Sequence, residues 1–217
     1  MRGVRLAEAR RERRPLPLVK LPDMTSVPSP DLRPRCQWVS AQRPDDVHYH
    51  DTEWGVQLTG DDAMFERVAL EGFQAGLSWI TILRRRENFR KAFKNFQIAK
   101  VARMSDKDVE KLMDNDGIIR NRAKIASTIS NAKLTLRLED SLTDIIWSHA
   151  PKVRTKRVSA EKFEFAAITP ESEALSKTLR TLGFSFVGPT TMYALMQSIG
   201  MVNDHAPGCF RRNQLQD

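Results

Sequence analysis

An acidic residue inside an apolar run is the first candidate for chemistry in this sequence. Glu71 follows apolar residues at helical spacing, and Leu77, Trp79 and an arginine run at 84–86 come soon after it. An acid, an indole and nearby cations suit a pocket that holds a nucleic-acid base, with the phosphates beside it. Each residue also has an ordinary interpretation: a half-buried glutamate, a core tryptophan and a solvated arginine face.

A metal site is the second candidate, formed by residues from both ends of the core. Cys36 precedes a histidine-containing segment at 48–50, while His205 and Cys209 have the spacing of four that is common for two zinc ligands. One cysteine and one histidine from each end would complete a tetrahedron. Such a closed site leaves no position for water, so the metal would be structural. Small buried cysteines without a metal are an equal alternative.

The bulk composition favours a polyanionic partner, either nucleic acid or an anionic membrane face. The chain has 217 residues with 41% hydrophobic content, enough for one substantial core, and its formal net charge is +8. No apolar run approaches the length of a transmembrane helix, and two cysteines are too few for a disulfide framework. We therefore expect a protein of the reducing cytoplasm that does not span a membrane. The expected partners include no membrane, and in a bacterium the protein would be associated with the nucleoid.

Helical periodicity dominates, so the predicted fold class is all-α. A helix opens near Asp61 and is broken at Gly72 and Gly76. Further helices are expected over 88–104, 105–115, 125–136, 142–147, 169–182 and 190–199. Residues 1–34, rich in arginine and proline, are expected to be a disordered basic extension. Residues 35–212 would form one domain and residues 213–217 a tail.

A helix-hairpin-helix is predicted near residues 106–136. Its short hairpin contains Gly117, and Arg120, Arg122 and Lys124 follow towards the second helix. Amide groups freed at a hairpin and at a helix N-terminus attract an anion, so the motif would bind DNA phosphates without reading sequence. An ordinary turn between two helices with a solvated basic face is the alternative.

Five segments, in order along the chain, resemble the 3-methyladenine DNA glycosylase I family. They are residues 36–38, 49–55, 70–79, 117–122 and 202–209, within a resemblance that covers residues 35–212. The resemblance implies a helix-hairpin-helix glycosylase fold. It also implies hydrolysis of the N-glycosidic bond of 3-methyladenine in double-stranded alkylated DNA, which leaves the free base as product. The family often has a second tyrosine where this chain has Asp45-Asp46-Val47-His48.

The resemblance also implies roles for single residues. A structural Zn²⁺ would be held by Cys36, His50, His205 and Cys209, with His50 preferred to His48 because it follows Tyr49 in the family motif. The base pocket would be formed by Tyr49, Glu71 and Trp79, with Trp38 nearby. Glu71, the expected catalytic residue, would accept a hydrogen bond from the adenine edge and stabilise the cation. Trp79 would stack on the charged base through a cation–π interaction.

Leu77 is expected to fill the gap that an extruded nucleotide leaves in the duplex, although packing in the core is an equal interpretation. Because no lysine is placed as an amine nucleophile, we expect a monofunctional glycosylase without lyase activity, acting as a monomer. Two other functions fit the same residues. One is a non-catalytic, zinc-stabilised protein that binds damaged DNA; the other is a helical adaptor for RNA or an acidic protein.

Overall fold

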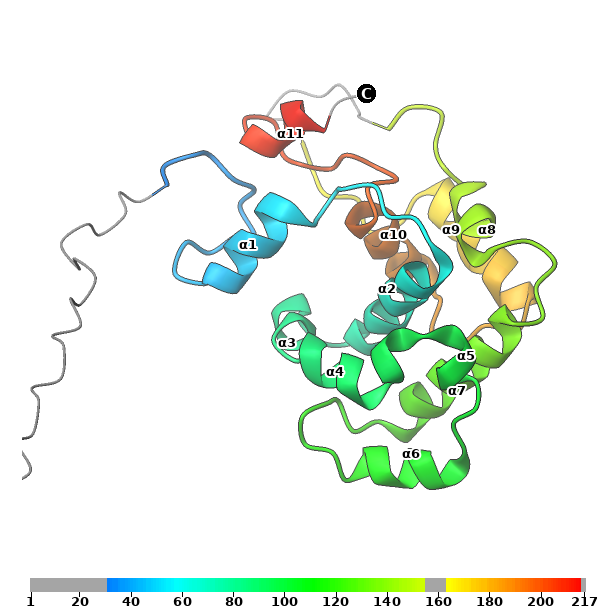
Figure 1. The fold of residues 1–217 in the computed structure, drawn as a ribbon. Helices are drawn as coiled ribbons and strands as arrows, with labels where there is room; N and C mark the ends of the chain where they lie inside the picture. The colour runs from blue at the N-terminus through cyan, green and yellow to red at the C-terminus, as the bar shows by residue number, and fades with distance from the viewer. Residues whose placement is uncertain (1–30, 155–162, 216–217) are drawn as a thin grey trace, which may run out of the picture. The chain divides into compact units, whose positions relative to one another are not determined.

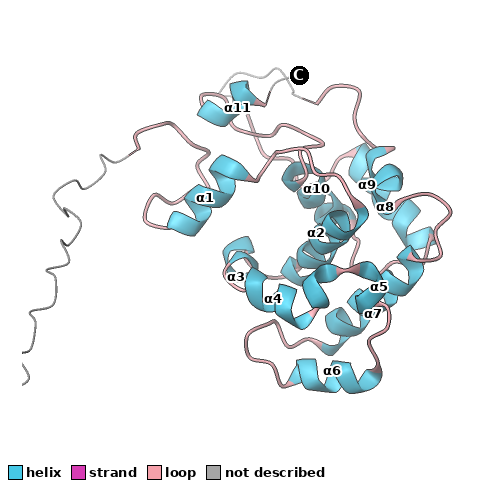
Figure 2. Ribbon diagram, viewed as in Figure 1, coloured by secondary structure: helices cyan, strands magenta, loops and turns pink. Residues whose placement is uncertain are grey.

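The protein was analysed as a computed structural model that describes residues 31–154 and 163–215. This described part is helical and contains no strand (Figure 2), which confirms the predicted all-α class. The predicted extension lies outside it, apart from residues 31–34. The elements are α1 Pro44–Thr52, α2 Asp61–Gln74, α3 Trp79–Leu83, α4 Arg86–Ala92, the 3₁₀ turn η1 Lys94–Phe96, α5 Ile98–Val101, α6 Asp106–Met113, α7 Arg122–Thr135, α8 Leu142–Trp147, α9 Pro170–Thr181, α10 Pro189–Ser198 and α11 Phe210–Gln214.

Helix α2 is at the centre of the unit formed from residue 33 onward, where it packs against α10 and contacts α3, α5, α7 and α8 (Figure 1). Its buried face contains Met64, Phe65, Val68 and Phe73. Burying each large apolar side chain contributes about 1.5–3 kcal/mol. Glu71 lies on this same well-packed helix, so the fold holds a carboxylate rigidly inside the core. None of the described helices is long and apolar enough to cross a membrane.

Local sequence signals set several helix ends as predicted. Helix α6 begins with the capping box formed by Ser105 and Asp108. Helix α9 begins after Thr169, which accepts a hydrogen bond from the Ser172 amide, and has proline at its first position. These caps satisfy amide groups that a helix N-terminus would otherwise leave without partners. They are local effects and therefore readable from sequence.

The single helix predicted over 88–104 is wrong. The segment is divided into α4, η1 and α5, because Lys94, Asn95 and Phe96 adopt left-handed φ angles of 56°, 54° and 51°. The turn lets Phe93 and Phe96 stack at 5.6 Å between ring centroids, with both rings fully buried. Burial of these rings offsets the backbone strain, which periodicity alone does not reveal.

The two glycines expected to interrupt α2 behave differently. Gly72 lies within the helix, where a Cβ atom would come within 3.3 Å of the Phe186 Cβ, so this glycine allows a close approach. Gly76 has a φ of 81° and lies just beyond the helix end. Only the second glycine therefore acts as the predicted breaker.

Candidate functional site

A cavity of about 320 Å³ opens between α1, α2, α3 and α10. Its volume is in the range of small-molecule sites, and its walls are largely aromatic. The lining residues are Trp38, Tyr49, Trp54, Glu71, Gln74, Trp79, Phe165, Ala166, Ala194, Gln197 and Ser198. The structure thus brings together the four residues expected to form a base pocket: Trp38, Tyr49, Glu71 and Trp79.

Glu71 is the buried acid of this cavity, and it is 3% exposed. Its Oε2 atom has no hydrogen-bond partner among the described residues. Burial raises the pKa of Glu71 to about 7, while the positive charge of Arg67 and a hydrogen bond with Ser198 act to lower it. A buried carboxylate oxygen without a partner is costly. The cavity is therefore suited to a ligand that brings a hydrogen-bond donor to Glu71.

The indole of Trp79 offers the complementary group. Its Nε1 atom is buried and, like the Glu71 oxygen, lacks a partner within the described part of the chain. Its ring lies 5.1 Å from that of Tyr49, at 42° between planes. A ligand could therefore meet Trp79 in one of two ways: at the ring edge, with an acceptor for the Nε1 proton, or on the ring face, with a flat, electron-poor ring.

Arg67, a residue that the sequence analysis did not single out, orients Tyr49 by a hydrogen bond to its hydroxyl group. Arg67 Nη1 donates to the Tyr49 hydroxyl at 3.3 Å, and its Nη2 lies 3.7 Å from Glu53 Oε2. Because the tyrosine oxygen accepts from Arg67, its own proton is available to donate elsewhere. Arg67 precedes Glu71 by one helical turn, and that i,i+4 spacing is the signal that could have identified it.

Two of the three arginines at 84–86 make internal ion pairs. Arg84 Nε donates to Asp45 Oδ2 at 2.6 Å, and Arg86 donates to both Glu53 oxygens at 2.5 and 2.8 Å. These contacts tie α4 and the end of α3 to α1 and the residue after it. Arg84 and Arg86 therefore hold α1, the helix that carries Tyr49, in place. Their partners lie more than thirty residues earlier in the sequence, so the sequence alone does not indicate these contacts.

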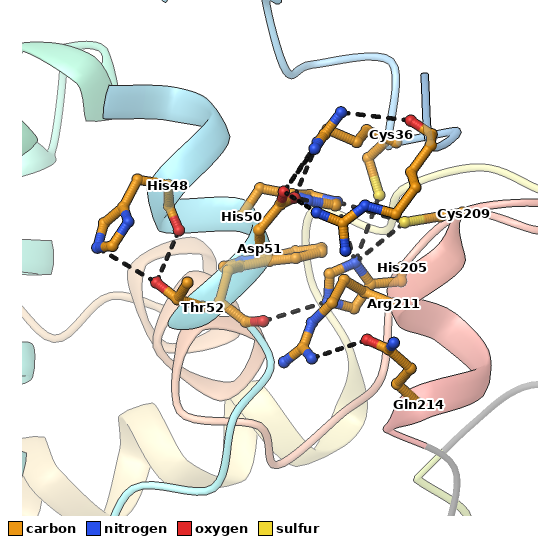
Figure 3. Close-up of polar contacts among 12 residues, drawn as sticks. Cys36, His48, His50, Asp51, Thr52, His205, Cys209, Arg211 and Gln214 are labelled. Atoms are coloured by element: carbon orange, nitrogen blue, oxygen red, sulfur yellow. Dashed lines mark hydrogen bonds and ion pairs between the residues drawn. The ribbon is translucent and has the colours of Figure 1, made fainter. Parts of the chain in front are cut away.

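A buried Cys2His2 cluster lies beside the cavity and could hold a metal ion. The ligand atoms of Cys36, His50, His205 and Cys209 are within 4.8 Å of one another (Figure 3). His50 Nε2 is 3.4 Å from Cys209 Sγ and 3.2 Å from His205 Nδ1. His48, the alternative histidine, lies apart and contacts Thr52 instead (Figure 3).

Both histidines of the cluster are oriented through their second ring nitrogen. His50 Nδ1 is 2.8 Å from Asp51 Oδ1, and Asp51 accepts hydrogen bonds from Arg35 at 2.6–3.1 Å. His205 Nε2 is 3.2 Å from the Trp54 carbonyl oxygen. Such contacts fix the tautomer and leave the other nitrogen to face a metal. The geometry of the donor set is therefore that of a prepared site.

The cluster and the cavity share a wall. His50 follows Tyr49 in α1, and the ring of Trp38 lies 5.4 Å from that of His50 and 5.2 Å from that of Trp54. The residues that would hold a metal thus pack directly against residues that line the cavity. Disruption of the cluster would therefore displace Trp38 and Tyr49, which line the cavity.

Helices α6 and α7 pack against each other in the segment predicted to be a helix-hairpin-helix, but the groups expected to bind phosphates there differ in their exposure and partners. Arg120 and Arg122 are exposed, and Arg122 pairs with Glu110 across the hairpin at 2.5 Å. The Gly117 amide already donates to Asn115 Oδ1 at 2.9 Å, so it does not point freely outward as expected. Leu77 is 43% exposed on the turn after α2, so it is not a residue of the core.

The prediction that Lys124 contacts a DNA phosphate is wrong, because its side chain is buried. It is 8% exposed, and its ammonium donates to the carbonyl oxygens of Phe73 at 2.9 Å and Ala75 at 2.6 Å. The side chain therefore points into the protein, towards the end of α2. Its position after the hairpin gave no sign of this contact, because the partners lie about fifty residues earlier in the sequence.

Enzymes that act on single bases of DNA, glycosylases among them, place an extruded base in a snug pocket lined by aromatic or apolar side chains, as this cavity is. The sequence profile of the methyladenine glycosylase family matches residues 38–212. DNA-3-methyladenine glycosylase 1 of Escherichia coli (strain K12) is 47% identical over 181 residues, which cover 81% of this chain and 95% of that protein. The DNA-3-methyladenine glycosylase of Haemophilus influenzae is 42% identical, covering 81% and 96%. The chain belongs to the methyladenine glycosylase family.

Solved structures agree with this assignment. A crystal structure of 3-methyladenine DNA glycosylase I has a TM-score of 0.78 at 46% identity, covering 82% of this chain and 98% of that one. A structure of the Staphylococcus aureus enzyme, which addresses recognition of 3-methyladenine, has a TM-score of 0.73 at 30% identity, covering 79% and 93%. The resemblance seen in the sequence motifs thus extends to the fold.

Proposed function

We propose that this protein hydrolyses the N-glycosidic bond of 3-methyladenine in double-stranded alkylated DNA. The observation that carries the proposal is the unpartnered oxygen of Glu71, buried in an aromatic cavity. The amino group of an adenine edge would supply the missing donor. The positive charge of an N3-methylated adenine suits both this carboxylate and the indole face of Trp79.

The reaction begins with extrusion of the damaged nucleotide, which costs a few kcal/mol and less for a lesion than for a normal pair. Leu77 fills the gap in the duplex, and Arg120 and Arg122 hold the phosphates. In the cavity, Trp79 stacks on the base and Glu71 and Tyr49 bind its edge. Binding and orientation then supply much of the catalysis, because the alkylated base is already a good leaving group.

Bond cleavage leaves the electron pair of the C1′–N9 bond on the base, which becomes neutral. Water adds its oxygen to C1′ of the sugar and loses a proton to solvent. Lyase chemistry would require an amine at C1′, and among the described residues that line the cavity none is a lysine. This supports a monofunctional glycosylase, which would act as a monomer in the cytoplasm.

We further propose that the Cys2His2 cluster holds a structural Zn²⁺. With Zn–S bonds of about 2.3 Å and Zn–N bonds of about 2.0 Å, a tetrahedral site requires N···S edges of about 3.5 Å and an N···N edge of about 3.3 Å. Three of the four N···S distances are 3.4–3.6 Å and the N···N distance is 3.2 Å, and all four ligand atoms lie within 4.8 Å of one another, so the donor set fits. Four protein ligands close the site to water, so the ion would stabilise the fold.

Incubation of the protein with methylated duplex DNA, followed by identification of the released bases, tests the activity. Free 3-methyladenine should appear, and Glu71→Gln should weaken binding of the free base, measured by quenching of tryptophan fluorescence. Glu173→Gln, at an exposed position of α9, is the matched control. Binding of methylated duplex without release of any base would instead favour a damage-binding protein. Equal affinity for methylated and plain duplex would favour an adaptor.

A further inference from the structure

Lys124 makes the buried contact that links the helix-hairpin-helix to the end of α2. The carbonyl groups in the last turn of a helix have no partner within the helix. The Lys124 ammonium supplies one for Phe73 at 2.9 Å and for Ala75 at 2.6 Å. Burial lowers the pKa of Lys124. The favourable position of a cation at a helix C-terminus opposes that effect.

The residues that follow α2 form a turn that exposes Leu77. The Leu77 amide donates to the Gln74 carbonyl oxygen at 2.6 Å, which closes the turn. Ala75 has φ −48° and ψ 116°, and Gly76 has φ 81°, the values of a type II turn with glycine at its third position. Types I and II differ by a flip of the peptide between the two central residues. Here that peptide joins Ala75 to Gly76.

Lys124 contacts the very carbonyl group that would move in such a flip. Its hydrogen bond to Ala75 O favours the type II orientation, because a flipped peptide would turn this oxygen away from the ammonium. Its second bond, to Phe73 O, anchors the same ammonium on the helix itself. The lysine thus fixes the turn relative to α2, the helix that carries Glu71, and relative to α7 in the helix-hairpin-helix.

We propose that Lys124 is a positioning residue, which holds the Ala75–Gly76 peptide so that Leu77 points into the duplex when the damaged nucleotide is extruded. The inference rests on the proposed function, since it concerns how the turn serves base extrusion. It replaces the phosphate contact expected for Lys124. Through α7, binding of phosphates at the hairpin is mechanically connected to the residue that fills the gap in the DNA.

The test compares Lys124→Met, which keeps an aliphatic stem and removes the donors, with two matched variants. Lys133→Met makes the same change at an exposed position of α7, and Arg120→Met removes an expected phosphate contact. In Lys124→Met, release of 3-methyladenine from duplex DNA should fall about 10- to 100-fold, the cost of a small misplacement. Binding of the free base should remain within about 2-fold of the wild type. Lys133→Met should match the wild type in both assays.

The salt dependence of duplex binding separates positioning from phosphate contact. The slope of log affinity against log salt concentration should fall by about 1 in Arg120→Met. In Lys124→Met it should equal that of the wild type. A slope reduced as in Arg120→Met, or an unchanged rate of base release from duplex, would overturn the inference. So would a loss of free-base binding as large as the loss of activity, because the pocket itself would then be damaged.

A double-mutant cycle with Leu77→Ala links the two residues. If Lys124 acts through Leu77, the loss caused by Leu77→Ala should be much smaller in the Lys124→Met background, and additive losses would contradict the proposal. Should Lys124→Met not fold, Lys124→Leu, which also removes the donors to Phe73 and Ala75, serves in the same comparisons. Base release by the wild type is measured first, since its absence would refute the proposed function rather than the role of Lys124.

Discussion

Burial of Glu71 makes the stability of the protein depend on pH. Its pKa is raised from 4.5 to about 7, so the folded state binds more protons than the unfolded state between these values. The contribution of Glu71 to stability is therefore full below about pH 4.5, falls as the pH rises, and levels off above about pH 7. The loss is on the order of 3 kcal/mol.

Glu71→Gln removes this titration. The stability of the variant relative to the wild type should therefore rise as the pH increases from about 4.5 to about 7. Urea unfolding of both proteins at about pH 5 and about pH 8 measures the difference. Glu173→Gln should change little at either pH, because Glu173 is exposed. A stability difference between Glu71→Gln and wild type that is the same at both pH values would contradict the assignment of this pKa to Glu71.

Arg67 should influence the pH at which Glu71 ionises, and so the pH dependence of base release. The positive charge of Arg67 lowers the pKa of Glu71, against the larger effect of burial. If ionised Glu71 binds the cationic base, kcat/KM for base release should rise with pH through about 7. Arg67→Met should move this midpoint to higher pH, whereas Arg67→Lys should leave it close to the wild-type value because it retains the charge. Equal midpoints in all three proteins would exclude the role.

Single residues of the site could be predicted where their type was unusual in its local pattern. Glu71 stands out as an acid in an apolar run, and His205 and Cys209 have the spacing of metal ligands. Lys124 could not be placed in this way, since a basic residue near a hairpin looks the same whether it faces solvent or a distant carbonyl group. Only the fold brings it to Phe73 and Ala75.

At the scale of elements, α7 holds a second loop besides the turn after α2. Buried Asn131 donates to the Ser185 carbonyl oxygen and accepts from the Ser185 amide, both at 3.1 Å. Phe186, the next residue, has a left-handed φ of 59°, so the loop depends on such contacts to hold a strained conformation.

Asn131→Ala should lower the free energy of unfolding by about 2 kcal/mol, because two backbone groups lose their partner in a partly buried place. Ser130→Ala, at the preceding exposed position of α7, provides the control. Denaturant unfolding measures both variants. A loss in Asn131→Ala no larger than that of the control would mean that water replaces the amide at little cost.

Elements were predictable when local signals coincided, as in α6, α8 and α9. Helix α1 was not assigned, because it is polar along most of its length and buries Asp46, Tyr49 and His50 instead of an apolar stripe. Its environment is the Cys2His2 cluster on one side and the ion pairs from Arg84 and Arg86 on the other. A helix stabilised by such distant partners carries little periodicity in its own sequence.

For the molecule as a whole, the cluster joins segments that are far apart in the chain. Cys36 and His50 come from the segment around α1, while His205 and Cys209 precede α11. Arg154 adds a second connection nearby, with hydrogen bonds to the carbonyl oxygens of Gly55 and Gly200. Trp38 and Tyr49 therefore line the cavity on a wall whose position depends on the opposite end of the chain.

Cys209→Ser should reveal this dependence. The variant should lose Zn²⁺ by elemental analysis and melt at a lower temperature, since a structural zinc site contributes directly to folding. Amide hydrogen exchange should accelerate in α1 and in residues 203–212, while α6 and α7 keep their protection because they lie away from the cluster. Binding of free 3-methyladenine should weaken as well, through the contact of Trp38 with His50.

Wild-type protein produced with ample zinc yet free of metal would refute the zinc assignment. Faster exchange spread evenly over all helices would show instead that the substitution destabilises the fold without acting through the joined ends.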